Sequence, residues 1–190
     1  MSETQKHLDD IAQIRAIMER NTKFLSLSGL SGISAGICAL VGAVAAWLYM
    51  NQSIDYIDAV VSRPPAEIMT FFILDAGLVM IFAVSFATYF SMRLAKQKGF
   101  EVWNKSAWHM LVNLFIPLAA GGLFCVIQLL HYSVLWVPST MLLFYGMALM
   151  NAGKFTFPEI RYLGVSEIIL GLACAIWVEG GLIFWAIGFG

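Results

Sequence analysis

Long apolar segments separated by short polar stretches constrain this chain more than any other feature. Six such runs follow the first 23 residues, and most approach the roughly 20 residues that an α-helix needs to cross a bilayer core. They are Phe24–Tyr49, Ile68–Met92, Trp108–Leu130, Val134–Ala152, Ile160–Ile176 and Trp177–Gly190. With 60% hydrophobic and 12% charged residues, the chain differs strongly from soluble domains, which average about 45–50% apolar and about 25% charged residues. We therefore predict an all-α fold, a polytopic transmembrane helix bundle of about six spans over residues 24–190.

The sixth run is too short for a complete span. Trp177–Gly190 contains 14 residues, which extend about 21 Å as a helix, less than the hydrocarbon thickness of about 30 Å. Two interpretations remain open. Either the chain is truncated inside its sixth helix, which we favour, or this segment enters the membrane without crossing it.

Serine and glycine crowd the start of the first run, in "SLSGLSGISAG" (26–36). In water this composition is typical of flexible linkers, but backbone polar groups inside a bilayer must hydrogen-bond within the chain, so we expect a helix. Small side chains let membrane helices approach closely. The face that they form is thus predicted to pack within the monomer or across a homodimer. Its members, which include a GxxxG pair, are Ser28, Gly32, Ala35, Gly36, Ala39, Ala43 and Ala46.

Basic residues are distributed unevenly between the predicted loops. Of the 11 Lys and Arg residues, all except Arg63 precede the first run or lie in the even-numbered loops. Because cytoplasmic loops are enriched in Lys and Arg, the N-terminus is predicted to be cytoplasmic. Topology thus accounts for the basic residues, and nothing in their distribution indicates a nucleic-acid partner.

Residues 1–23 are predicted to form a cytoplasmic amphipathic helix. Leu8, Ile11, Ile14 and Met18 recur at the spacing of an apolar helix stripe. The polar face mixes acidic and basic residues, so strong attraction to anionic lipid is not expected. This helix is predicted to lie on the membrane or on the cytoplasmic loops, with a cytoplasmic protein partner as the alternative.

Polar residues inside the apolar runs are the candidates for a functional site, because they are costly in a bilayer and usually face the bundle interior. Asp75 lies about 12 Å inside one end of the second run, and Glu167 lies at a similar depth in the fifth. The same depth count places Ser85, Asn113 and Tyr145 near the level of Glu167. These residues form either a small-molecule or ion site with Glu167 as its ionisable member, or a hydrogen-bonded structural knot.

Patterns typical of catalytic, metal or cofactor sites are nearly absent from the sequence. We find no HExxH, nucleophile elbow, P-loop or dinucleotide-binding fingerprint in a suitable context. His109 and His131 lie at opposite ends of one run, about 33 Å apart along a helix. Cys38, Cys125 and Cys174 lie inside apolar runs without metal-type spacing and are interpreted as packed thiols. No metal and no cofactor is therefore predicted.

Two segments, "IMERNTKFLSLSGLSGISAG" and "IRYLGVSEIILGLACAIWVEGGLIFWAIGFG", resemble an uncharacterised family of small bacterial polytopic inner-membrane proteins. The resemblance implies a multi-pass protein of the bacterial inner (cytoplasmic) membrane that continues beyond Gly190, and it implies no established activity. Such chains sometimes carry a carotenoid-cleaving oxygenase label. That enzyme class is similar to a soluble propeller that binds iron through four histidines, whereas this chain has three, His7, His109 and His131, on separated segments. No catalytic residue is carried over.

Three functions of different classes follow from these features. The first is a non-enzymatic module that binds a protein or lipid partner through the first span and the N-terminal helix. The second is a transporter or channel for a small molecule or ion, with Glu167 and Asp75 along its path. The third is a membrane-embedded enzyme acting on a lipid or quinone. The expected partners are the lipid bilayer, a second copy through the first span, and a cytoplasmic protein.

Overall fold

The computed structural model describes residues 5, 11, 29–50, 64–98, 105–131 and 133–190. Helices account for most of these residues, and no strand occurs among them. The elements are α2 (Gly29–Tyr49), α4 (Pro65–Lys98), α5 (Lys105–Leu130), the 3₁₀-helix η1 (Val134–Trp136), α6 (Val137–Ala152), α7 (Pro158–Ile176), the 3₁₀-helix η2 (Val178–Gly180) and α8 (Gly181–Phe189). The all-α prediction is confirmed for the described residues.

Among the described residues, four helical segments are long and apolar enough to cross a membrane: Gly29–Tyr49, Ala66–Gln97, Ala107–Leu130 and Val134–Ala152. Helix α7 has 19 residues but carries three charged side chains, and α8 has 9 residues, too few to cross. The chain is therefore an integral membrane protein with a helical bundle in which four membrane spans are defined by length and composition.

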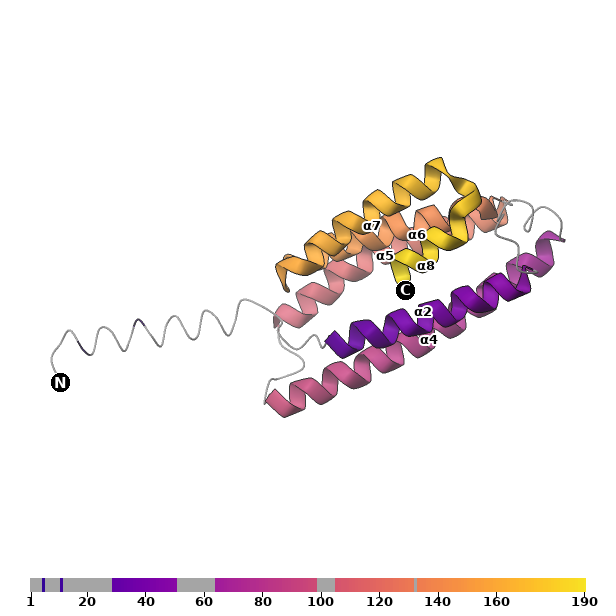
Figure 1. The fold of residues 1–190 in the computed structure, drawn as a ribbon. Helices are drawn as coiled ribbons and strands as arrows, with labels where there is room; N and C mark the ends of the chain where they lie inside the picture. The colour runs from indigo at the N-terminus through magenta and orange to yellow at the C-terminus, as the bar shows by residue number, and fades with distance from the viewer. Residues whose placement is uncertain (1–4, 6–10, 12–28, 51–63, 99–104, 132) are drawn as a thin grey trace.

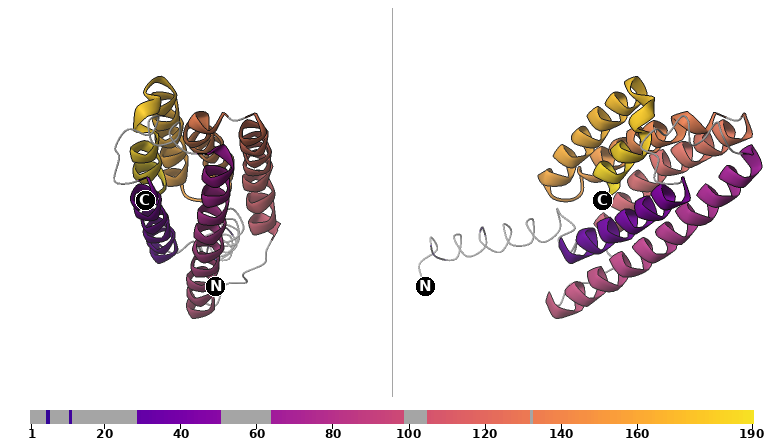
Figure 2. Two further views of the ribbon diagram at one scale, coloured as in Figure 1. Left: turned by 90° about the vertical axis from the view of Figure 1, so that its right-hand side faces the viewer. Right: turned by 45° about the vertical axis from the view of Figure 1, so that its right-hand side comes forward.

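Helix α8 joins two groups of helices (Figure 1). Helices α2 and α4 pack along one another, and α6 packs against both α5 and α7. Helix α8 contacts α2, α6 and α7. It turns back from the end of α7 and runs into the bundle between α7 and α2, as Figures 1 and 2 show. The 3₁₀-helix η2 makes this reversal.

Helix α2 has one face of small residues and one of large residues. The small residues Ala39, Gly42, Ala43 and Ala46 are buried. The large side chains are exposed on the outside of the bundle, where a membrane would offer them lipid contacts. These are Leu30, Ile33, Ile37, Leu40, Val44 and Leu48. The Ser/Gly-rich stretch is helical from Gly29 onward, as predicted; residues 26–28, Ser28 included, lie outside the described residues.

Helix α4 begins at Pro65, where the missing backbone N–H removes no helical hydrogen bond. Glu67 in its first turn interacts favourably with the positive end of the helix dipole. With 34 residues the helix extends about 51 Å. The Phe71 ring stacks on Tyr49 at the end of α2, with ring centroids 3.8 Å apart. This stack holds the end of α2 against the start of α4.

Glycines bring α6 and α7 into backbone contact. A methyl group on Gly146 would lie 2.7 Å from the Gly164 carbonyl oxygen, and one on Gly164 would lie 2.7 Å from the Gly146 carbonyl oxygen. A methyl group on Gly171 would lie 3.0 Å from the backbone nitrogen of Leu143. Close backbone approach of this kind favours helix association in lipid through van der Waals contact. We call the α6–α7 contact lined by Gly146, Gly164 and Gly171 the glycine seam.

Candidate functional site

Glu167 lies inside the glycine seam. Gly164, Glu167, Gly171 and Cys174 are the buried residues of α7, and their spacing of three or four places them on one helix face. The Glu167 side chain is only 4% exposed. Its Oε2 atom is buried without a hydrogen-bond partner, an arrangement that is costly for a carboxylate. A carboxyl group in this environment must bind a proton, a cation or a polar ligand to offset its lost hydration.

Helix α8 covers the Glu167 carboxyl group through Gly188. A methyl group on Gly188 would lie 2.7 Å from Glu167 Oε2 and 3.1 Å from Leu170 Cδ2, and it would overlap Leu142 Cδ2. Leu142 is itself fully buried. Glycine is thus needed here to allow a close approach, and the other two side chains at this contact, Leu142 and Leu170, are apolar.

Tyr145 on α6 lies close enough to Glu167 for the charge of the carboxylate to act on its phenol. Its ring lies 4.9 Å from that of Phe189, centroid to centroid. Residues from α6, α7 and α8 thus meet around Glu167. We call Glu167, Tyr145, Leu142, Leu170 and Gly188 the Glu167 site.

The structure does not bring Ser85 and Asn113 to this site. Ser85 is exposed on α4, whose main packing partner is α2. Asn113 lies on α5, and its amide Nδ2 donates to the His109 carbonyl oxygen one turn earlier, at 2.8 Å. The predicted cluster of four helices therefore reduces to the pair Glu167 and Tyr145.

Asp75 belongs to a different contact. A methyl group on Gly42 of α2 would lie 3.4 Å from Asp75 Oδ2 and would overlap Val79 Cγ2. The Asp75 carboxyl group thus lies between α2 and α4, half-buried, whereas Glu167 lies between α6, α7 and α8. The two acids predicted along one path belong to separate helix contacts.

The predicted packing residues of the first span lie in three kinds of environment. Ala39 and Ala43 are buried. A methyl group on Gly36 would lie 2.8 Å from the Gly190 carbonyl oxygen, so Gly36 faces the end of α8, whereas Gly32 has open space around it. The two GxxxG glycines therefore do not share one contact.

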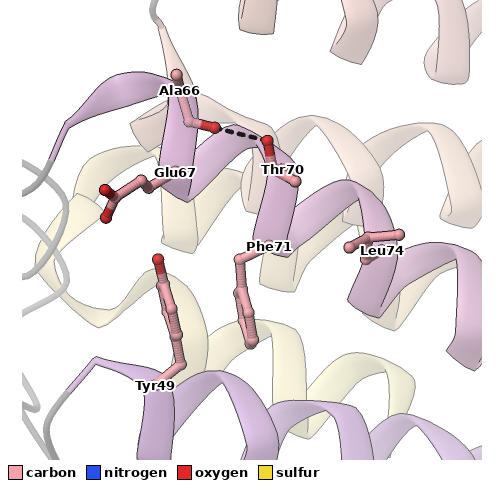
Figure 3. A pocket seen from close by; sticks show the side chains of 6 residues that line it. All are labelled: Tyr49, Ala66, Glu67, Thr70, Phe71 and Leu74. Carbon is pink, nitrogen blue, oxygen red and sulfur yellow. Dashed lines mark hydrogen bonds between the residues drawn. The ribbon is translucent and has the colours of Figure 1, made fainter.

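A shallow groove lies where α2 ends and α4 begins (Figure 3). Its volume is about 460 Å³, and it is lined by Tyr49, Ala66, Glu67, Thr70, Phe71 and Leu74. The Thr70 hydroxyl donates to the Ala66 carbonyl oxygen at 2.8 Å, within its own helix, and the Glu67 side chain is exposed. Because the groove is open and its acid is solvated, its polar groups need no ligand, in contrast to Glu167.

Sequence reasoning missed the glycines that build the Glu167 site. Close contacts between helices occur at Gly146, Gly164, Gly171 and Gly188. The sequence analysis predicted such contacts only for the small residues of the first span. The spacing of Gly164, Glu167 and Gly171 in "GVSEIILG" already places the acid on a small-residue helix face. That pattern was the available signal.

Within the residues that the structure describes, no group of three or more His, Cys, Asp or Glu side chains could hold a metal ion. The predicted amphipathic helix of residues 1–23 lies outside the described residues, except for residues 5 and 11.

Comparisons with protein-family models, curated proteins and solved structures gave no match. The fold and the site thus define the class of protein on their own. The chain is a helical integral membrane protein with a carboxyl group buried between three helices.

Proposed function

We propose that this protein moves an ion or a small ionisable solute across the membrane by way of Glu167. The observation that carries the proposal is the burial of this carboxyl group inside a membrane bundle, with Oε2 unpartnered. Ionisable residues inside membrane segments are costly and typically mark ion or substrate pathways. A purely structural acid would be expected to hydrogen-bond with both oxygens.

The contact between α8 and Glu167 gives this proposal further support. Helix α8 enters the bundle for about 14 Å and places Gly188 against Glu167. Its displacement would uncover the carboxyl group without disturbing the glycine seam.

The proposal includes a topology of six membrane-embedded helices with a cytoplasmic N-terminus, in the bacterial inner membrane. The distribution of Lys and Arg supports the orientation. In α7, Glu159 and Arg161 lie near the first turn, where they can reach the interface. Glu167 is then the charged residue deep in this helix.

The non-enzymatic binding module receives less support. Ala39 and Ala43, which were predicted to pack within the monomer or across a homodimer, are buried by the chain's own helices, and Gly36 faces α8. A cytoplasmic partner would use residues 1–23, most of which lie outside the described residues. For an enzyme, no second reactive group besides Tyr145 lies in the Glu167 site.

The test is ion flux in sealed lipid vesicles that contain the purified protein. Gradients of protons, Na⁺ and K⁺ are imposed in turn, and each flux is compared with that of protein-free vesicles. We expect flux of at least one ion with the wild type and its loss with Glu167→Gln, which preserves side-chain shape. Glu159→Gln is the matched control, because Glu159 is an exposed acid on the same helix.

Equal flux for wild type and Glu167→Gln would refute the proposal. Wild-type flux no greater than that of protein-free vesicles for all three ions would refute transport of protons, Na⁺ and K⁺ by this site. Circular dichroism of each variant verifies that the helices are retained.

A further inference from the structure

We infer that the ion bound at the Glu167 site is the proton rather than a metal cation. The role of this proton in transport rests on the proposed function, whereas proton binding itself is argued from the chemistry of the site. It follows from the ligands, the space and the titratable groups around the carboxyl group.

The ligands at the site are too few for a metal cation. Mg²⁺ requires near-octahedral coordination, and Ca²⁺ takes six to eight oxygen ligands. An added methyl group on Gly188 would meet Glu167 Oε2 and the apolar tips of Leu142 and Leu170. Among the described residues, no group of three or more His, Cys, Asp or Glu side chains could hold a metal ion. A proton needs one oxygen only, and a protonated carboxyl group carries no net charge to desolvate.

The space at the site is equally restrictive. A methyl group on Gly188 would overlap Leu142 and would lie 2.7 Å from Glu167 Oε2. A cation with even part of its hydration shell is larger than a methyl group. With α8 in this position, Oε2 can therefore be neutralised by a proton without any rearrangement of the helices.

Few titratable or charged groups face Glu167 from the surrounding helices. Tyr145 is the facing group on α6, and α8 contains no titratable side chain. On α7 itself, Cys174 is buried two turns away on the same face. The exposed Lys154 after α6 donates to Asn151 Oδ1 at 3.1 Å. Among the described residues, no basic side chain thus donates a hydrogen bond to Glu167 Oε2.

The test uses dicyclohexylcarbodiimide, an apolar reagent that modifies protonated carboxyl groups in membranes. The carboxyl proton moves to one nitrogen of the reagent, and the carboxylate oxygen bonds to its central carbon, giving a covalent adduct with the combined mass. Intact protein in lipid vesicles is treated at a series of pH values, with and without high Na⁺ or K⁺. Mass spectrometry then locates and quantifies the adduct.

We expect an adduct at Glu167 that diminishes as the pH rises and is unaffected by Na⁺ or K⁺. Glu167→Gln should lose this adduct, whereas Glu159→Gln should retain it. Protection of wild-type Glu167 by Na⁺ or K⁺ would show a metal-cation site and overturn the inference, while leaving ion transport intact. An adduct at Glu167 that does not diminish as the pH rises would also overturn it. An adduct in a protein without ion flux would support proton binding and refute the transport proposal separately.

Discussion

The contact between Gly188 and Glu167 gives a sharp prediction for the variant Gly188→Ala. The added methyl group would overlap Leu142 Cδ2 and crowd both Glu167 Oε2 and Leu170 Cδ2. Leu142 is fully buried, so its side chain would have to shift against its neighbours to admit the methyl group. Extra methyl groups in a well-packed core typically destabilise by about 1–3 kcal/mol.

Helix propensity acts in the opposite direction, because alanine is favoured over glycine by about 1 kcal/mol in a helix interior. A control variant removes this contribution from the comparison. Gly122 lies in α5 and has no atom within 4 Å of the position of an added methyl group. Gly122→Ala should therefore be neutral or slightly stabilising. The difference in unfolding free energy between the two variants should be about 1–3 kcal/mol.

The assay is unfolding in mixed micelles with increasing sodium dodecyl sulfate, followed with a thiol-reactive dye. Cys174 is buried beside the Glu167 site on α7, so its reaction reports loss of the α6–α7–α8 packing. Cys38 and Cys125 are replaced by alanine in all variants to leave this single reporter. Equal stability of Gly188→Ala and Gly122→Ala would refute the packing of α8 against Glu167.

Four further variants test the rest of the structure. Gly36→Leu should destabilise the monomer by about 1–3 kcal/mol, because the new side chain meets the end of α8. Gly32→Leu should be neutral, because the position of Gly32 has open space around it. The same unfolding assay compares the two variants, and a larger loss of stability in Gly32→Leu would contradict the α2–α8 contact. Gly164→Val should weaken the glycine seam by at least as much, measured as faster dye reaction at Cys174. Tyr145→Phe keeps the ring that contacts Phe189 and should therefore retain this stability in the same assay.

Helix positions were well predicted, because in a membrane apolar length almost determines where a helix can form. The fourth and fifth runs end at Ala152 and Ile176, and so do α6 and α7. Helix α4 is longer than its run at both ends, extending from Pro65 to Lys98. Proline at the first helical position and the long basic side chains at the other end allow this extension beyond the apolar core.

The composition of the site was only partly predictable. The sequence gives only the depth of a residue along its span, and this depth places Glu167 and Tyr145 at a similar level in the membrane. The face of each helix and the identity of its neighbours depend on tertiary packing, which placed Ser85 on an exposed face and directed Asn113 to its own backbone. The direction of packing is determined largely by glycines such as Gly164 and Gly188, which become informative once the helices are placed.

The most direct test of the central claim is proton entry into vesicles under an inside-negative potential. Wild type, Glu167→Gln and Glu167→Asp are compared at equal protein content with an internal pH-sensitive dye. The account predicts rapid acidification with wild type, none above background with Glu167→Gln, and partial activity with Glu167→Asp, whose carboxyl group is one methylene shorter. Acidification by Glu167→Gln at the wild-type rate would contradict the claim that Glu167 carries the ion.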